Sequence, residues 1–518
     1  MKRGGVMRLI KIKMLSDYKL FKQNQEFVFG DDSTLGIVGI NGSGKSILLE
    51  LISKIFVDAS NQITQKNYSS DISYEAIYSL QKDHMIESVL VGIGGQWEAT
   101  DYVLIKLENQ SQHFKMIISN GRDEFEIKNI NIYYVFFPRK IVVYSSGHNE
   151  GISDEIINYK LYSLAEKDSQ KIKKNNYGEV INKGILDRYN ELFYYFDDTI
   201  SKLAILTSFM FESEYQGILS EFFEKALVTS FKIRLDKKDI YDEDIYFDEK
   251  ASYLLNEIMS YANTVHVNEN GFEYYEFHAP ENRDREQMSL LAFFEGLQRL
   301  YDYNIYKIKK RTLNRIIYGN EKSKKSLVDW NIANHRVFEL LEMTFKTENG
   351  SELELRNFSD GEYQVLQLIS ILSIFYGSNI LFLLDEPETH FNPSWKSLFV
   401  SKVKSMLNPM SQVVFSSHNP EVITDLRKTS VVSMKRGVQS GLQIETFGAN
   451  PNMISANLFD KRNTVAELAK QEINIFRNKI NQTTSHQDLE ELKHEIENVL
   501  GDSSERLMLI IEIQKRMM

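Results

Sequence analysis

The chain of 518 residues has no cysteine and only 7 prolines. The lack of cysteine excludes disulfides, thiolate zinc sites and cysteine nucleophiles, and it fits a reducing cytoplasm, where we expect this protein to act. The scarcity of proline argues against long proline-rich linkers. With a net charge of −11, the surface as a whole does not suit a nucleic acid, so any contact with DNA or RNA would be a local patch.

Long apolar runs are scarce as well. The first residues lack the apolar core of a signal peptide, because Lys11 and Lys13 interrupt it, and Met7 is an alternative start of the chain. The longest apolar stretch, residues 368–384, contains a turn signal at 377–379, so it predicts a buried helix, a turn and a buried strand. We therefore expect no association with a membrane.

The order of apolar patterns divides the chain into four regions. Residues 1–150 are rich in predicted strands with one helix, and residues 151–334 are mainly helical by period, with a few strand-like interruptions. Strand patterns return in residues 335–450, and residues 451–518 are predicted to form amphipathic helices. This order predicts an α/β fold, in which a nucleotide-binding head with a mixed sheet and an antiparallel β lobe is split by a helical insertion and followed by a helical tail.

Single strands are predicted where apolar residues alternate or run together. Residues 133–138 and 442–447 are two such predictions. Residues 61–83 are instead interpreted as a polar stretch, and residues 181–211 are interpreted as helical.

The segment Gly39-Ile40-Asn41-Gly42-Ser43-Gly44-Lys45-Ser46 matches the pattern GxxxxGK[ST], and it lies between a buried strand and a helix. Glycines at such a turn let successive backbone N–H groups curl around phosphates, and the start of a helix adds a positive dipole. Lys45 would reach the β- and γ-phosphates, and the Ser46 hydroxyl would ligate Mg²⁺. The residues expected at the nucleotide are Gly39, Asn41, Gly42, Ser43, Gly44, Lys45, Ser46 and Ile47.

Two further apolar strands end in polar side chains. Residues 380–384 run into Asp385 and Glu386; Asp385 would hold Mg²⁺ through water, and Glu386 would act on the attacking water as general base. His418 follows the strand at 413–417 and could hydrogen-bond the γ-phosphate. Charged turn residues and loop histidines are common without such roles, so each motif alone is open between catalysis and structure.

The stretch RNFSDGEYQVLQ contains Ser359, Gly361 and Glu362. Ser359 and Glu362 have the spacing of a capping box at a helix start. A helix start also attracts phosphate, and Gly361 would let a phosphate from another chain approach the backbone. A helix cap and a nucleotide contact are therefore both open, and the two are compatible.

The order of these motifs resembles the ABC-type ATPase superfamily. The phosphate loop comes first, then the strand ending at Asp385, and then the strand before His418. Residues 388–393 are similar to the D-loop of that family. Ser359 lies 26 residues before Asp385, which is where the family carries its signature motif.

The spacing of the motifs narrows this resemblance. Lys45 and Asp385 are 340 residues apart, and this gap, together with Glu362 in the signature, resembles the RecF/SMC/Rad50-like branch. The insertion is too short for the long arms of SMC proteins, and the chain looks like the compact bacterial ATPases of OLD-type, Septu-associated and retron-associated phage-defence systems. Unlike OLD-type enzymes, it has no D-x-D among the 100 residues after His418, so we expect no nuclease within this chain.

The resemblance implies ATP and Mg²⁺ as cofactors, with catalysis by Glu386 and His418 together with Lys45 and Asp385. It implies a homodimer, or a higher oligomer of dimers, in which ATP lies between the phosphate loop of one chain and the signature of the other. It also implies a separate effector protein, an HNH nuclease or a toxin, in antiphage defence. The alternative is a RecF-like DNA repair or recombination ATPase, and a transporter subunit and a non-hydrolysing scaffold are further rivals.

A cluster of basic residues lies between Lys307 and Lys325, with tyrosines interleaved. It could bind DNA or RNA through phosphates and stacking. The competing interpretation is a solvated helix face, and the sequence leaves both open.

Two parts of the family's nucleotide site have no clear residue in this sequence. Gln81 and Gln96 are the nearest candidates for the Q-loop glutamine. Tyr18 or Phe21 could stack on adenine, although a buried aromatic residue at a strand end is the competing interpretation.

Overall fold

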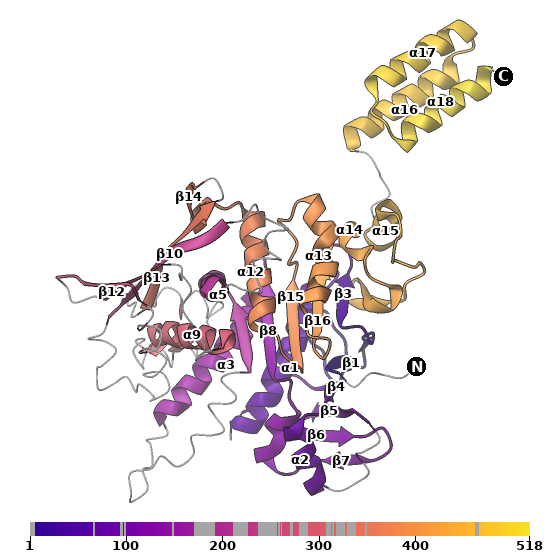
Figure 1. The fold of residues 1–518 in the computed structure, drawn as a ribbon. Helices are drawn as coiled ribbons and strands as arrows, with labels where there is room; N and C mark the ends of the chain where they lie inside the picture. The colour runs from indigo at the N-terminus through magenta and orange to yellow at the C-terminus, as the bar shows by residue number, and fades with distance from the viewer. Residues whose placement is uncertain are drawn as a thin grey trace, which may run out of the picture. The chain divides into compact units, whose positions relative to one another are not determined.

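The computed structural model describes three sheets with their helices and a separate group of helices at the C-terminal end (Figure 1). Gln96 and nearly all of the basic cluster between Lys307 and Lys325 fall outside the described residues. The residues that the structure describes are 6–65, 68–93, 97, 100–147, 150–169, 192–210, 226–236, 256, 260, 262–269, 273–278, 289–306, 312, 315–316, 327–328, 338–347, 350–460 and 466–517.

One sheet is antiparallel, with six strands in the order β2-β1-β4-β5-β6-β7, which confirms the predicted antiparallel lobe. Its strand β4 (Tyr74–Gln81) lies in the stretch that was interpreted as polar, and that interpretation is wrong. Tyr74, Tyr78 and Leu80 are buried on alternate positions of β4, so tyrosines supply much of the apolar face. The other strands are β1 (Arg8–Met14), β2 (Glu26–Val28), β5 (Tyr102–Gln110), β6 (His113–Ser119) and β7 (Glu124–Glu126).

The second sheet has seven strands in the order β18-β17-β3-β16-β15-β8-β9. All pairs are parallel except β17 with β18, so the sheet is mixed, as predicted. Its edge strand β9 (Phe193–Phe196) lies in a segment that was wrongly interpreted as helical; all four residues are buried, so no alternation marks the strand. The remaining strands are β3 (Thr34–Val38), β8 (Lys140–Ser145), β15 (Ile380–Asp385), β16 (Gln412–Ser417), β17 (Val431–Lys435) and β18 (Val438–Ser440).

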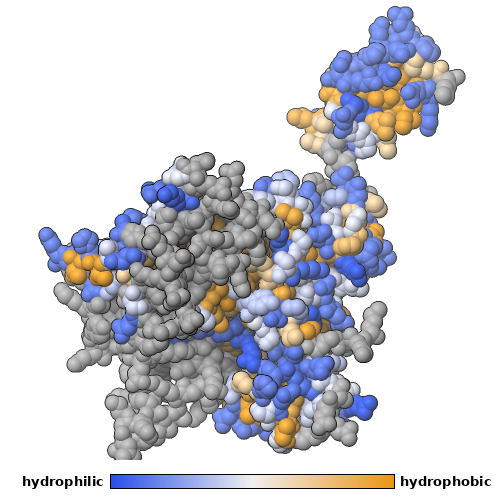
Figure 2. Space-filling view, in the orientation of Figure 1, coloured by the Kyte–Doolittle hydropathy of each residue, from blue (hydrophilic) through white to orange (hydrophobic). Residues whose placement is uncertain are grey.

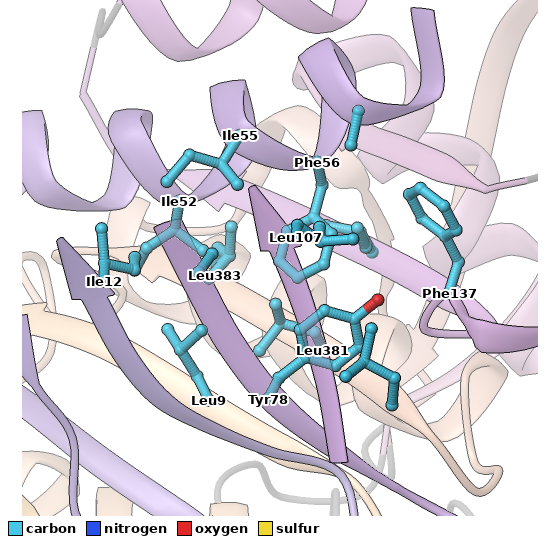
Figure 3. Packing of buried hydrophobic residues seen from close by; sticks show 14 of the residues in the cluster. Leu9, Ile12, Ile52, Ile55, Phe56, Tyr78, Leu107, Phe137, Leu381 and Leu383 are labelled. Carbon is cyan, nitrogen blue, oxygen red and sulfur yellow. The ribbon is translucent and has the colours of Figure 1, made fainter. Parts of the chain in front are cut away.

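Helix α1 (Lys45–Thr64) lies between these two sheets and joins them in one hydrophobic core (Figure 3). Ile52 and Phe56 of α1 belong to the same buried cluster as Leu383 of β15 and Tyr78 of β4. Full burial of an apolar side chain of this size contributes about 1.5–3 kcal/mol. Because α1 starts directly after the glycine-rich turn of residues 39–44, this core fixes the position of that turn.

The other face of the mixed sheet is covered by α12 (Asp360–Ile374) and α13 (Pro393–Met406), as Figure 1 shows. The ring of Phe399 on α13 lies 5.1 Å from that of Phe415 on β16. The preceding residue, Val414, belongs to the core around α1, so successive residues of β16 face opposite layers.

A third, antiparallel sheet has the order β11-β12-β10-β13-β14. Helices α5 (Asp198–Met210) and α9 (Leu290–Tyr306) contact it. The Tyr363 hydroxyl on α12 donates to Asp198 Oδ1 at 2.9 Å, which ties α5 to the head. The strands are β10 (Ala226–Leu235), β11 (Thr264–Val267), β12 (Glu273–His278), β13 (Phe338–Thr347) and β14 (Glu352–Glu354).

Two predicted strands are wrong. Residues 133–138 lie mostly in a 3₁₀ helix, η1 (Ile130–Phe136), of which only the last turn is buried. Residues 442–447 form no strand, because Glu445 Oε1 accepts from backbone N–H groups such as that of Thr446 and replaces ladder bonds. The remaining elements described in this unit are α2 (His84–Ile93), α3 (Glu150–Ser169), η2 (Leu355–Asn357), α14 (Pro420–Ile423) and η3 (Lys428–Ser430).

Residues Asn450–Met518 form a second compact unit, and its helices agree with the predicted helical tail. The core of its last three helices includes Phe476, Ile496 and Leu509. Figure 2 shows apolar side chains on part of its visible surface as well; exposed examples are Leu468, Ile475, Leu507 and Met508. The helices are α15 (Pro451–Leu458), α16 (Glu467–Gln482), α17 (His486–Val499) and α18 (Ser504–Met517).

A bilayer-spanning helix is not found in the described part of the chain, where every helix is too short or too polar to cross one. The apolar stretch 368–384 is instead divided between α12, a turn and β15. This division is the one that its turn signal predicts.

Candidate nucleotide-binding site

Residues 39–44 form the turn between β3 and α1, and Lys45 and Ser46 are the first two residues of α1. Gly39, Gly42 and Gly44 have φ angles of 155°, 75° and 101°, which favour glycine. A side chain at Gly39 would collide with the backbone, because an added Cβ would lie 2.3 Å from Met434 O. The turn therefore needs glycine at the positions that the pattern specifies.

The side chains of this loop are divided between surface and interior. Asn41 is exposed, Ser43 is buried, and Ile47 packs against the core around α1. Within the part of the chain that the structure describes, the buried Ser43 Oγ has no hydrogen-bond partner. A buried hydroxyl without a partner is costly, so a ligand that enters the loop would gain a ready donor.

Lys45 is only 5% exposed, and its Nζ donates to the carbonyls of Gly39 at 3.0 Å and Ile40 at 3.3 Å. Burial lowers the pKa of this ammonium, and the carboxylates of Glu386 and Asp385 oppose that shift. The lysine is thus folded over the loop, where incoming phosphates would replace the two carbonyls as partners.

Asp385 lies at the end of β15, opposite the first turn of α1. Its Oδ1 accepts from Ser46 Oγ at 2.8 Å and from Ser416 Oγ at 2.5 Å, and its carbonyl accepts from Ser146 N at 3.1 Å. Mg²⁺ is usually bound through one or two carboxylates plus phosphate and water oxygens. The pairing of one hydroxyl with one carboxylate fits that ion.

Glu386 and His418 form the next pair. Glu386 Oε1 lies 3.1 Å from His418 Nδ1. The hydrogen bond from His418 lowers the pKa of Glu386, and the same bond raises the pKa of His418. Glu386 also has a φ of 49°, a conformation that costs a non-glycine residue about 1–3 kcal/mol and that clusters at functional sites. An ionised, partly exposed carboxylate in this place can accept a proton from water.

A third carboxyl, that of Glu388, is 1% exposed and lies behind this pair. Its Oε1 accepts from Ser417 Oγ at the end of β16. Burial raises the pKa of Glu388 to about 7, against the opposing effect of the Ser417 hydroxyl. From the sequence, no individual role was assigned to Glu388, Ser416 or Ser417. The signal that could have found them is their position: Glu388 follows β15, and the two serines end β16, so they lie where the carboxyl ends of neighbouring parallel strands meet.

The raised pKa of Glu388 makes a prediction about stability. Between its ordinary value of 4.5 and about 7, the folded protein keeps a proton that the unfolded chain has lost. The free energy of unfolding should therefore fall as the pH rises through this window, by up to about 3 kcal/mol. Urea unfolding of nucleotide-free protein at pH 5 to 8 measures it: Glu388→Gln should gain stability relative to wild type as the pH rises, and parallel curves would contradict the assignment.

Ser359 is the N-cap of α12, and both bonds of the predicted capping box are present. Ser359 Oγ accepts from Glu362 N at 3.3 Å, and Glu362 Oε2 accepts from Ser359 N at 2.7 Å. Gly361 is buried, and a Cβ there would lie 2.6 Å from His390 O. Gln364 Oε1 accepts from His390 N at 2.9 Å, so the D-loop-like segment packs on this helix start.

Of the residues left open for the Q-loop and adenine, Gln96 lies outside the described residues, and Gln81, Tyr18 and Phe21 are hydrogen-bonded or packed within the protein. The backbone of Gln81 bonds the side chain of Asn379 at 2.8 and 3.0 Å, at the beginning of β15 and away from its acidic end. Phe21 is fully buried. The Tyr18 hydroxyl donates to Glu50 Oε1 on α1 at 2.5 Å, so it is engaged with the protein itself.

Comparison with known proteins supports the predicted resemblance. Residues 206–424 match the family described as "AAA domain, putative AbiEii toxin, Type IV TA system". The "Retron Vc95 probable ATPase" of Vibrio cholerae serotype O1 biovar El Tor is 21% identical over 445 residues, which cover 80% of this chain and 71% of that protein. The chain is therefore similar to a family with an AAA domain over part of its length and to a probable ATPase of a retron over most of its length.

Other similarities are more limited. "Protein ea59" of Escherichia phage lambda is 29% identical over 110 residues, 20% of this chain and 21% of that protein. SMC head domains from Pyrococcus furiosus and Thermotoga maritima match 85% and 84% of this chain and 96% and 100% of those chains, at 14% and 11% identity and a TM-score of 0.32 in both cases. Such a TM-score does not establish a common fold, so the fold rests on the strand order given above.

Proposed function

We propose that this protein is an ATP-hydrolysing switch of the ABC type that controls a separate effector. The observation that carries the proposal is the meeting of three sequence-distant segments at one edge of the mixed sheet. The Ser46 hydroxyl bonds Asp385 at 2.8 Å, and Glu386 lies 3.1 Å from His418. These are the groups that phosphoryl transfer to water needs in one place.

Each group has a role in this proposal. Lys45 and the loop N–H groups would bind the phosphates, and Glu386 would take a proton from the attacking water. His418 would hydrogen-bond the γ-phosphate. Ser46 and Asp385 would hold Mg²⁺, which neutralises phosphate charge when bound.

The switch would be a head-to-tail homodimer, or a higher oligomer of such dimers. ATP bound to the phosphate loop of one chain would contact Ser359 and Gly361 of the other, at the capped start of α12. Hydrolysis would remove the γ-phosphate contact and open the dimer. The support for this geometry is the position of the signature helix beside the D-loop-like segment, which joins two parts of the family's dimer surface.

The effector would be a separate HNH nuclease or toxin, and the system would be a bacterial antiphage defence. The similarity to a retron-associated ATPase supports this part of the proposal. Tight, ATP-dependent binding of DNA ends or gaps by the isolated chain would instead favour the RecF-like repair alternative. Co-purification with a membrane protein would favour a transporter subunit.

The proposal is tested by phosphate release from ATP by the purified chain, with Mg²⁺ and after its removal with a chelator. We expect turnover that depends on Mg²⁺, together with ATP-dependent dimers in gel filtration. ATP binding without turnover would favour the alternative of a scaffold that uses ATP only for assembly. Absence of ATP binding would refute the proposal.

Lys45→Ala should weaken ATP binding about 10- to 100-fold, because a buried charge-assisted hydrogen bond contributes roughly 1.5–3 kcal/mol. A fluorescent ATP analogue measures the affinity. Lys479→Ala is the matched control, since it removes an ammonium that is 45% exposed and paired with Glu495 in the C-terminal unit. Equal affinities for the two variants would contradict the role given to Lys45.

A further inference from the structure

Glu388 is placed unlike the other carboxyls of the site. Glu386, two residues earlier, has a side chain that is 29% exposed, whereas Glu388 is 1% exposed. Among the described residues, Glu388 Oε2 is buried and has no hydrogen-bond partner. A group this far from solvent does not itself meet the attacking water, so its function must pass through the residue that it binds.

That residue is Ser417, the last residue of β16. Ser417 Oγ donates to Glu388 Oε1 and accepts from the backbone N–H of Asn419 at 3.0 Å. Asn419 Oδ1 in turn accepts from Glu421 N at 2.9 Å and caps α14. His418 lies between Ser417 and Asn419, which are bonded to each other. Through its bond to Ser417, Glu388 therefore anchors the turn that carries this histidine.

Glu388 is itself held from two sides. It follows Glu386 and Pro387, and the Glu386 N–H is bound to β16 through Ser416 Oγ at 3.0 Å. Its own carbonyl accepts from Phe391 N at 3.1 Å. The segment after β15 is thus joined to the end of β16 and the turn after it at three places. Glu386 bonds Ser416 through its backbone and His418 through its side chain, and Glu388 bonds Ser417. The bond between Glu388 and Ser417 is the buried one of these, and a hydrogen bond shielded from water is stronger than an exposed one.

We propose that Glu388 is a positioning residue for ATP hydrolysis, which fixes the turn from Ser417 to Asn419 and so holds His418 against Glu386. The proposal rests on the proposed function, since it assigns a role within that reaction. A displacement of about 1 Å in such a site can lower the rate about 100-fold. Binding of ATP depends on the phosphate loop, which Glu388 does not contact through any hydrogen bond that the described residues make.

The variants Glu388→Ala, Glu388→Gln and Ser417→Ala test this role. Glu388→Ala should lower kcat about 100-fold and leave KM and the affinity for a fluorescent ATP analogue within about threefold of wild type. Glu388→Gln should restore kcat to within about threefold of wild type, because its amide oxygen still accepts from Ser417. Ser417→Ala should match Glu388→Ala, and the double variant should be no slower than either, as expected for two partners in one bond.

Three kinetic results would overturn the proposal. The first is a normal kcat in Glu388→Ala. The second is a kcat as low in Glu388→Gln as in Glu388→Ala, which would assign the role to the proton or charge of the carboxyl. The third is an equal loss of kcat and ATP affinity together with a lower melting temperature, which would assign a general structural role.

A second measurement tests the anchoring role of Glu388 independently of ATP hydrolysis. Hydrogen exchange, followed by mass spectrometry on nucleotide-free protein, reports the turn whether or not ATP is hydrolysed. Peptides that cover residues 413–425 should exchange at least about tenfold faster in Glu388→Ala than in wild type, and Glu388→Gln should stay close to wild type. Unchanged protection in Glu388→Ala would refute the anchoring role, whereas a wild type without turnover would refute the proposed function alone.

Discussion

Glu386→Gln should lower ATP turnover at least about 100-fold and leave ATP affinity nearly unchanged. An amide cannot accept the proton of the attacking water, and general base catalysis contributes about 10²–10⁴-fold. The geometry should survive the change, because the amide oxygen can still accept from His418, which lies 3.1 Å from the carboxylate. The bond that the Glu386 backbone N–H donates to Ser416 Oγ, at 3.0 Å, does not involve the Glu386 side chain at all.

The measurement is phosphate release under saturating ATP, with affinity from a fluorescent analogue. Glu388→Gln is the matched control, because it makes the same chemical change two residues along the same turn and should keep most of the turnover. The ATP-bound Glu386→Gln protein should also accumulate as a dimer in gel filtration. Equal turnover in Glu386→Gln and wild type would refute the general base, and absence of turnover in both would favour the scaffold alternative.

The parts of the site that the sequence predicts are those built from contiguous residues. A phosphate loop needs glycines at fixed positions and a lysine at the helix start, so Gly39 and Lys45 are recognisable in the sequence. The same is true of the capping box, in which Ser359 and Glu362 are three residues apart and form both expected bonds.

The parts that the sequence does not predict arise from pairing between distant strands. In the sequence, Ser416 and Ser417 look like ordinary residues of a buried strand. The pairing of β16 with β15 is what places Ser416 beside Asp385. The role of Glu388 likewise depends on its burial against Ser417, which no local pattern specifies. The two missed strands have other causes: tyrosines supply much of the apolar face of β4, and all four residues of β9 are buried, so β9 lacks the polar–apolar alternation that reveals a strand.

Gly361 is compatible with both interpretations of its segment, the helix cap and the nucleotide contact. An added Cβ would lie 2.6 Å from His390 O, so packing within the chain already requires glycine here. That packing brings the helix start and the D-loop-like segment together, and both belong to the surface through which the proposed dimer would form. The glycine is therefore compatible with a contact to a partner's nucleotide but does not depend on it.

Ser359→Arg should abolish ATP-dependent dimerisation and lower turnover at least about 100-fold, while the monomer keeps its affinity for ATP. In the proposed dimer, the N–H groups at the start of α12 approach the phosphates held by the other chain. A long arginine side chain in place of Ser359 would prevent this approach, and a catalytic group displaced by about 1 Å already costs about 100-fold. Affinity for ATP should persist, because the phosphate loop is a separate segment between β3 and α1.

The substitution also removes an N-cap, which by itself costs about 1 kcal/mol, so the control must remove one too. Ser485 is such a residue: it caps α17, and its side chain accepts from the backbone N–H of Asp488, as Ser359 does from Glu362. Ser485→Arg should lose a similar amount of stability yet form ATP-dependent dimers and hydrolyse ATP. Both variants are measured by gel filtration with ATP and by phosphate release. Normal turnover in Ser359→Arg would show that Ser359 is only a helix cap and has no part in ATP hydrolysis.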